Sequence, residues 1–103
     1  MIIMQGNTYR LPVRLKMNGE HLTDENVQVV EFSFGENIVK SYPEEVTFEE
    51  DAFVLPLTQE ETFSLSSGSV SYQIRVLFPD GSVKASPVIS GMVAGSISKA
   101  VLS

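Results

Sequence analysis

The stretch VSYQIRVLF, residues 70–78, decides the fold class of this chain. Its apolar and polar residues alternate strictly up to Val76, and the apolar phase continues at Phe78. A period of two is that of a β-strand with one face against a core and the other toward solvent. We therefore expect a strand whose buried face carries Val70, Tyr72, Ile74, Val76 and Phe78.

The residues that follow predict a return strand. Residues 79–82, PDGS, form a turn, because Asp-Gly readily supplies positive φ. The return strand starts over residues 83–85 and resumes over residues 88–93. Pro87 interrupts it, since proline has no backbone N–H for a ladder hydrogen bond. The position of this proline predicts an edge strand or a bulge.

Further strands are expected toward the N-terminus. The same alternation runs over residues 9–17, where Tyr9, Leu11, Val13, Leu15 and Met17 share one face and Pro12 again indicates an edge or a bulge. Residues 27–34 and 38–42 predict two more strands, and residues 46–48 and 53–57 predict a hairpin around an acidic tip.

One helical turn is expected near residues 58–63. Thr58 is the predicted N-cap and Glu61 stands three positions later, which is the capping-box pattern. The segment is short, so we interpret it as a crossover between two sheets.

The predicted fold class is all-β, a sandwich of seven to eight short antiparallel strands. Turn signals recur about every 8–12 residues, which is typical of β-sandwiches and barrels. A chain of 103 residues is expected to form one domain. We assign that domain to residues 1–95 and a C-terminal tail to residues 96–103.

The residue inventory favours no catalytic, cofactor or metal site. Cysteine is absent and His21 is the single histidine, so a thiolate site or a Ser-His-Asp triad is not expected. Neither a nucleophile-elbow motif nor a phosphate-binding glycine loop is present. The net charge of −6 disfavours binding to nucleic acid and to anionic membranes. The first residues do not form a signal peptide, so cytoplasmic synthesis is expected.

Charged side chains suggest one possible contact between copies of the chain. Arg10, Arg14 and Lys16 form a basic stripe on the outer face of the first long strand, and Arg75 joins it if the two strands are neighbours. An acidic rim on a second copy would complement this stripe in a head-to-tail contact. The alternative is ordinary, solvated surface charge. The acidic rim spans residues 44–51, and its tip consists of Glu49, Glu50 and Asp51.

The two ends of the chain are the other candidate interaction segments. Residues 1–5 are mostly apolar, and three further apolar residues lie near the C-terminus. Apolar residues at chain ends with no place in the core favour packing on another subunit. The C-terminal candidates are Ile97, Val101 and Leu102.

Several motifs, taken in order, resemble those of a known family. They are QGNTYRL at residues 5–11, LT at 22–23 before a strand ending in FSFG at 32–35, LTQEETF at 57–63, and the strand at 70–78 followed by DGS. In this order they resemble the N-terminal immunoglobulin-like domain of phage baseplate upper proteins and related short tail proteins.

The resemblance implies an immunoglobulin-like or fibronectin-like sandwich that acts as a non-enzymatic structural module of a phage or prophage tail or baseplate. Its implied location is the virion or prophage particle, and its implied partners are other phage structural proteins or other copies of itself in a homo-oligomer. The family has no catalytic residues to carry over.

Two other functions stay open at this point. A carbohydrate- or peptide-binding sandwich needs exposed aromatic side chains; tryptophan is absent, and Tyr42 is the one aromatic that could be exposed. A small acidic metal-binding domain would use the carboxylates of residues 44–51 and 60–61.

Overall fold

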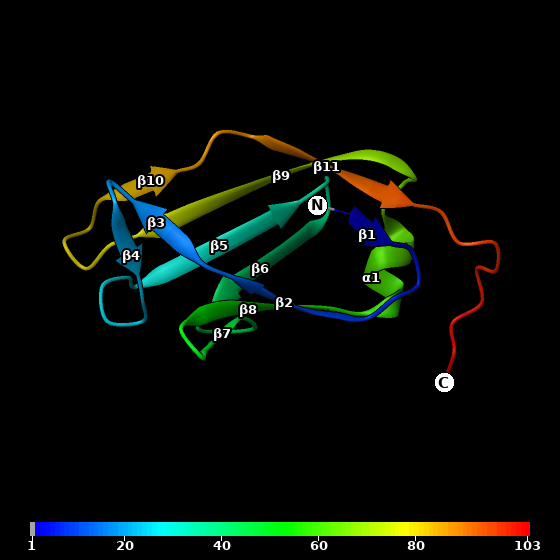
Figure 1. Cartoon of the computed structure of the whole chain (residues 1–103), viewed down its shortest axis with the longest axis horizontal. Helices are drawn as coiled ribbons and strands as arrows, with labels where there is room; N and C mark the ends of the chain where they lie inside the picture. Colours follow the sequence, from blue (N-terminus) through cyan, green and yellow to red (C-terminus); the bar gives the residue numbers. More distant parts are fainter. Residues whose placement is uncertain (1) are drawn as a thin grey trace.

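The computed structural model describes residues 2–103 and is mostly β-structure (Figure 1). Within these residues it contains eleven strands and one helix, where the sequence predicted seven or eight strands. The elements are β1 (Ile2–Met4), β2 (Tyr9–Val13), β3 (Leu15–Met17), β4 (Glu20–Leu22), β5 (Val29–Phe34), β6 (Ile38–Tyr42), β7 (Thr47–Glu49), β8 (Ala52–Leu57), α1 (Gln59–Ser64), β9 (Gly68–Leu77), β10 (Val83–Ala85) and β11 (Ile89–Ala94).

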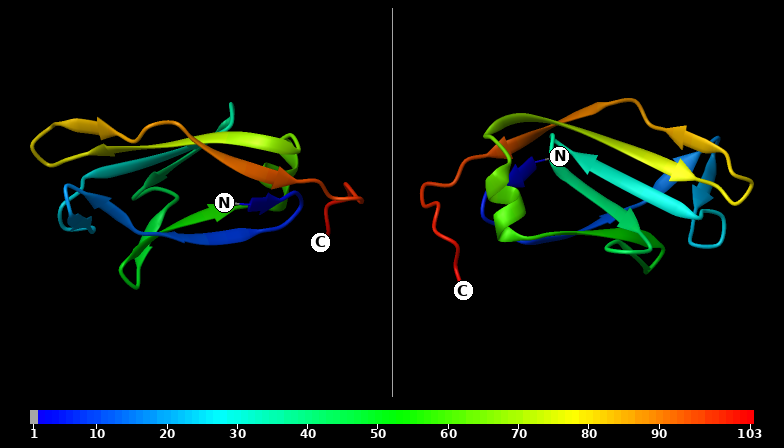
Figure 2. Two further views of the ribbon diagram at one scale, coloured as in Figure 1. Left: turned by 45° about the horizontal axis from the view of Figure 1, so that its top comes forward. Right: turned by 180° about the vertical axis from the view of Figure 1, so that it is seen from behind.

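The strands form two layers with a common core. The larger sheet has the order β1-β11-β9-β5-β6, with β10 also paired to β9. The second layer consists of the sheet β2-β8-β7 and the hairpin β3-β4. Figure 2 shows β9 and β11 in one layer and β2 and β8 in the other. Every pairing is antiparallel except that of β1 with β11, which is parallel and departs from the expected antiparallel arrangement.

The core lies between the layers and follows the predicted alternation. Val70 and Val76 of β9 are buried, and so are alternate residues of β5 and β8. The ring of Tyr42 packs edge-to-face on the buried ring of Phe53 at 5.2 Å. Tyr42, the one aromatic that could have been exposed, is therefore half-buried because its ring belongs to the contact between the layers.

Pro87 interrupts the last strand, as its position predicted. β10 and β11 both pair with β9, but the register changes between them. Ser86 donates its N–H to the carbonyl of Ile74, and Ile89 pairs with Tyr72. Two residues, Pro87 and Val88, therefore stand opposite one residue of β9, which is a β-bulge.

The first predicted long strand is divided. Its alternation holds, since its apolar residues all pack against the core, but it breaks at Arg14. Residues before the break pair with β8, and residues after it pair with β4. One continuous alternation thus serves two sheets, which the sequence pattern alone does not reveal.

The predicted helical turn is α1, and it crosses between the layers. Glu61 donates its N–H to the Thr58 hydroxyl, and the Glu61 carboxylate accepts from the Thr58 N–H, which confirms the capping box. The helix leads from β8 in one layer to β9 in the other. No helix within residues 2–103 has the length and apolar character needed to cross a membrane.

Candidate functional site

The basic stripe and the acidic rim lie on one face of the same chain. Arg10 on β2 donates to the Glu49 carboxylate at the end of β7 at 2.6 Å. The Thr47 hydroxyl donates to the same carboxylate. These contacts, first that with Thr47 and then that with Arg10, lower the pKa of Glu49 below its ordinary value. The charges proposed to join two copies thus partly neutralise each other within one copy.

Arg75 does not join the basic stripe. The stripe belongs to β2 and β3 in one layer, whereas Arg75 lies on β9 in the other. Its guanidinium donates to the Glu31 carboxylate of neighbouring β5 at 2.8 Å, and this hydrogen bond raises the pKa of Arg75. Arg75 would belong to the stripe only if its strand were a neighbour of the strand that carries the stripe, and the two strands are not neighbours.

The other two stripe residues form no ion pair within residues 2–103. Arg14 lines a shallow hollow together with Arg10, Glu49 and Glu50. Lys16 lines a different groove, at the β3-β4 hairpin. The stripe is therefore not one continuous site.

The acidic rim forms a tight turn next to the histidine. Glu50 and Asp51 join β7 to β8, both with positive φ. Nε2 of His21 lies 3.2 Å from a carboxylate oxygen of Asp51. Within residues 2–103 no group of three or more His, Cys, Asp or Glu side chains is placed to hold a metal ion. His21 is thus part of the link between the β3-β4 hairpin and the acidic turn.

The predicted apolar ends of the chain come together at one end of the molecule. The N–H of Gln5 donates to the carbonyl of Ala94, next to the parallel pairing of β1 and β11. The buried Gln5 carboxamide accepts from the Ser96 N–H and from Nζ of Lys99, and donates to the carbonyl of Leu65. One glutamine side chain therefore links the N-terminal strand, the C-terminal segment and the residue after α1.

A second glutamine holds the C-terminal segment farther along. The carboxamide of Gln59 bonds both the N–H and the carbonyl of Leu102. No residue in 95–103 belongs to a helix or strand. This segment is irregular and is held by side chains, while its larger apolar side chains are exposed to solvent.

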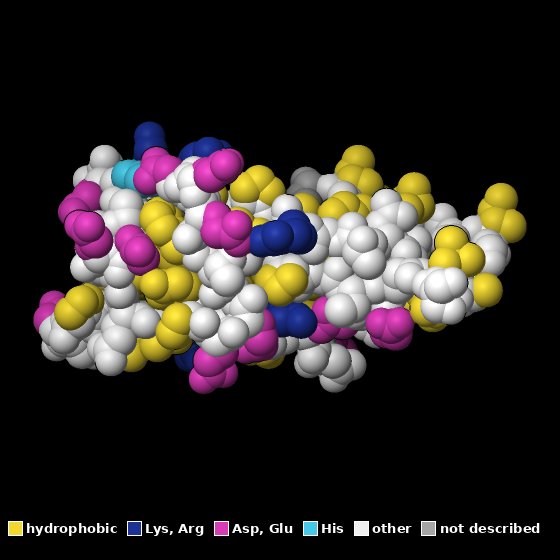
Figure 3. Space-filling view, turned by 90° about the horizontal axis from the view of Figure 1, so that it is seen from below, with side chains coloured by type: hydrophobic (Ala, Val, Ile, Leu, Met, Phe, Trp, Pro, Cys, Tyr) yellow, Lys and Arg dark blue, Asp and Glu magenta, His cyan; other side chains and the backbone are white. Residues whose placement is uncertain are grey.

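Exposed apolar side chains gather at this end, which we call the terminal surface. Ile2 is 70% exposed and Leu102 is 77% exposed. Met92 pairs with Ile2 in the ladder and shares its exposed position. Figure 3 shows hydrophobic and uncharged side chains at the end that holds the C-terminal segment, whereas most of the acidic side chains on this face lie toward the other end. The terminal surface comprises Ile2, Met4, Met92, Ile97, Val101 and Leu102.

The charge distribution follows the same division. All 13 acidic residues lie between residues 20 and 80. The segments on either side, 1–19 and 81–103, carry no acid but hold Arg10, Arg14, Lys16, Lys84 and Lys99. The residues of the terminal surface thus come from the acid-free segments of the sequence, although Glu60 and Glu61 of α1 adjoin Gln59, which holds Leu102.

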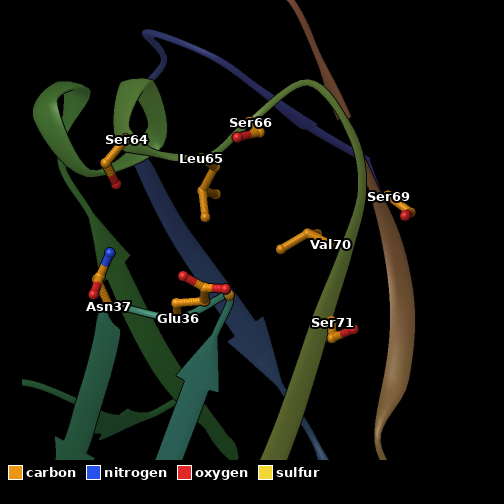
Figure 4. A pocket seen from close by; sticks show the side chains of 9 residues that line it. Glu36, Asn37, Ser64, Leu65, Ser66, Ser69, Val70 and Ser71 are labelled. Carbon is orange, nitrogen blue, oxygen red and sulfur yellow. The ribbon is translucent and has the colours of Figure 1, made fainter.

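A separate hollow of about 410 Å³ lies between α1 and the start of β9. Figure 4 shows polar side chains around it, among them Glu36, Asn37 and Ser66, and the apolar side chains of Leu65 and Val70. The hollow offers hydroxyl, amide and carboxylate groups over a small apolar floor. No aromatic side chain lines it.

Comparison with known proteins gives no relative. No family model, no curated protein and no solved structure matches the chain. The residues and their geometry are therefore the only basis for assigning a function.

Sequence reasoning missed the residues that build the terminal surface around its predicted members. Gln5 and Gln59 stand in the motifs quoted above, but neither motif indicates their role, since a glutamine that orders a distant backbone is indistinguishable in sequence from a solvated one. The sequence placed Met92 in the return strand but did not indicate that its side chain belongs to an interaction surface. Its exposure follows from the period of two, because the neighbouring residue Val93 is buried.

Proposed function

We propose that this chain is a non-enzymatic structural module that assembles through its terminal surface, and that its first partner is a second copy of the chain. The observation that supports this most is the convergence of both chain ends, with their exposed apolar side chains, at one end of the domain. Apolar side chains that are gathered in one place and left unburied mark an interaction surface.

The electrostatics favour the same end. A chain with a net charge of −6 repels its own copies, and association costs least where acidic groups are absent. The residues of the terminal surface come from segments without acids, and its neighbouring acids are Glu60 and Glu61 of α1. The face that carries Arg10 and Glu49 is a weaker candidate for association, because its charges already pair within one chain.

We further propose an immunoglobulin-like sandwich from the tail or baseplate of a phage or prophage particle. The two layers, the crossover through α1 and the motif order described above support this assignment. Mass spectrometry of virus particles purified from the organism that encodes the chain tests it. Recovery of its peptides together with tail proteins supports the proposal, and their absence from intact particles contradicts it.

The assembly role is tested by light scattering after size-exclusion chromatography. The wild-type chain is expected to elute as a dimer or larger species. Variants Ile97→Asp and Leu102→Asp are expected to elute as monomers with unchanged circular dichroism, because each places a charge in the contact. Monomeric wild-type protein at every concentration contradicts the proposal.

A matched control is available on another part of the larger sheet. Val39 on β6 is 52% exposed but lies outside the terminal surface. Val39→Asp makes the same chemical change and is expected to leave the oligomer intact. Equal loss of assembly in Val39→Asp and Leu102→Asp would show that the effect is not specific to the terminal surface.

The hollow at α1 favours one alternative function, the binding of a polyhydroxylated ligand such as a sugar. Its polar rim and the apolar floor of Leu65 and Val70 supply the two kinds of contact that sugar rings use. The lack of a lining aromatic, together with the buried contact of Tyr42, makes this the weaker candidate. A glycan array without a hit removes it.

A further inference from the structure

An apolar groove opens at the end of the molecule opposite the C-terminal segment. It has a volume of about 240 Å³ and lies between the β3-β4 hairpin and β10 (Figure 1). Leu22, Ile74 and Val76 form its apolar floor, and Leu15 and Met17 line it as well. These side chains belong to the core or pack against it, so the groove is an opening onto the core.

The walls of this groove are strand edges. On one side it is bordered by the consecutive residues 15–17 of β3, and on the other by the consecutive residues 84–87 around the end of β10. Successive residues of a strand point to opposite faces, so a groove bordered by consecutive residues follows the edge of the strand.

The edge of β10 has backbone groups that face the groove. Ser86 donates its N–H to Ile74 of β9, and the register continues through Ala85 opposite Arg75. In an antiparallel ladder alternate residues bond the partner strand, so the N–H and C=O of Val83 and Ala85 point away from β9. An extended peptide finds at this edge the groups that a neighbouring strand would use.

β1 shows how an added strand occupies an edge on this side of the larger sheet. β10 and β11 lie on the same side of β9, and β1 pairs with the outer edge of β11 at Met92–Ala94. The side chain of Ile3 at the centre of β1 is fully buried there. Farther along the same side of the larger sheet, at β10, no described strand takes the equivalent place.

The groove also has a charge preference. Lys16 lines the β3 side and Lys84 the β10 side. Neither lysine forms an ion pair within residues 2–103. Both come from segments of the sequence without acids, and the acids nearest to them in space, Glu20 and Asp80, line an adjoining hollow and not the groove. A ligand that complements this groove is apolar on one face and carries carboxylates.

We propose that this groove binds an extended peptide segment of a partner protein, which adds as a strand to the edge of β10. Its alternate apolar side chains point into the groove, and its flanking carboxylates meet Lys16 and Lys84. Main-chain hydrogen bonds supply affinity in this mode, while the side-chain pattern supplies specificity. The site is distinct from the terminal surface and does not depend on assembly there.

The test uses three labelled peptides and fluorescence anisotropy with the full chain. Glu-Val-Thr-Val-Glu is expected to bind saturably. Lys-Val-Thr-Val-Lys tests the charge requirement and Glu-Ser-Thr-Ser-Glu tests the apolar requirement, and both are expected to bind at least roughly fivefold more weakly. No saturable binding of the first peptide, or equal binding of all three, overturns the proposal.

Variants locate the binding. Lys16→Glu and Lys84→Glu are each expected to weaken the binding of the first peptide by roughly fivefold. Arg14→Glu makes a similar change on another face and is expected to leave the affinity for this peptide unaltered. Ala85→Pro removes an N–H that no ladder bond of the domain uses, so it is expected to abolish binding without lowering the melting temperature. If Ala85→Pro does not fold, the lysine variants still decide the question. Binding unaffected by both lysine changes overturns the proposal.

The oligomeric state separates this inference from the proposed function. Leu102→Asp, which is expected to prevent assembly at the terminal surface, leaves the groove intact and is expected to bind the peptide as the wild type does. Loss of peptide binding in this variant would place the peptide at the terminal surface and overturn the assignment to the groove.

Discussion

The carboxamide of Gln59 forms two hydrogen bonds with the backbone of Leu102. Nε2 of Gln59 donates to the Leu102 carbonyl at 2.6 Å, and Oε1 accepts from the Leu102 N–H at 3.0 Å. The side chain thus pairs with the backbone much as a neighbouring strand would. It orders a segment that belongs to no sheet, and it leaves the apolar side chain of Leu102 directed to solvent.

Gln59→Ala is expected to release the end of the C-terminal segment without unfolding the domain. Hydrogen exchange at the Leu102 amide should accelerate, while the free energy of unfolding changes by less than about 0.5 kcal/mol. Gln28→Ala, at an exposed glutamine away from the segment, is the control and should change neither quantity. Unchanged exchange at Leu102 in the Gln59 variant would mean that another contact holds the segment.

Thr62 joins α1 to the turn after β1, and its removal is expected to be costly. Its fully buried hydroxyl accepts from the Gly6 N–H and donates to the Asn7 carbonyl. Thr62→Val keeps the shape but leaves both backbone groups without this partner. We expect a loss of about 1–3 kcal/mol in chemical denaturation. Thr8→Val, at an exposed threonine, is the control and should lower the free energy of unfolding by less than about 0.5 kcal/mol.

The contact of Lys40 with Glu61 predicts a pH dependence of stability. Burial raises the pKa of Glu61, but hydrogen bonds from Lys40 and from the Thr58 N–H outweigh it, so the pKa lies below the ordinary value of 4.5. A depressed folded-state pKa gives stability that is present above pH 4.5 and is lost as the pH falls through the folded value.

Glu61→Gln is therefore expected to be less stable than the wild type at neutral pH. The difference in the free energy of unfolding should shrink as the pH falls below 4.5. Glu60→Gln, at the exposed neighbouring position, should show little difference at either pH. A Glu61 effect that is the same at neutral and acidic pH would show that shape rather than charge is responsible.

The acidic turn between β7 and β8 is a place where stability can be gained. Glu50 and Asp51 have φ of 49° and 67°, a region that costs most L-residues energy and that Asn-Gly occupies readily. Replacing the pair by Glu50→Asn and Asp51→Gly is expected to raise the free energy of unfolding by about 1 kcal/mol. Asp24→Gly, at an exposed residue without positive φ, should not stabilise. A destabilised double variant would show that the contact of Asp51 with His21 matters more than the backbone.

The sequence predicted the elements that have a period or a cap. The alternation from Val70 to Val76 predicted β9, Thr58 and Glu61 predicted α1, and Pro87 predicted the bulge. β1 and β4 were missed because three residues are too few to display a period; β7 and β10 are equally short, but each was predicted from the turn beside it. Their pairing depends on distant residues, as in the parallel ladder of Ile2 with Met92.

The candidate site was predictable only in part. The apolar character of Ile97, Val101 and Leu102 is visible in the sequence, but the course of their segment depends on Gln5 and Gln59, whose role has no local signature. The pairing of Arg10 with Glu49 was hidden for a similar reason, since it requires the register that places β2, β8 and β7 side by side.

The central claim is that two copies meet through the terminal surface, and spin labels measure this directly because the chain contains no cysteine. One label at Ser90→Cys on β11, next to Met92, is compared with one at Ser82→Cys in the turn before β10, at the other end (Figure 1). Electron–electron double resonance is expected to give a defined short intermolecular distance for Ser90→Cys and a longer one for Ser82→Cys. No intermolecular distance at either position, or the shorter distance at Ser82→Cys, would contradict the claim.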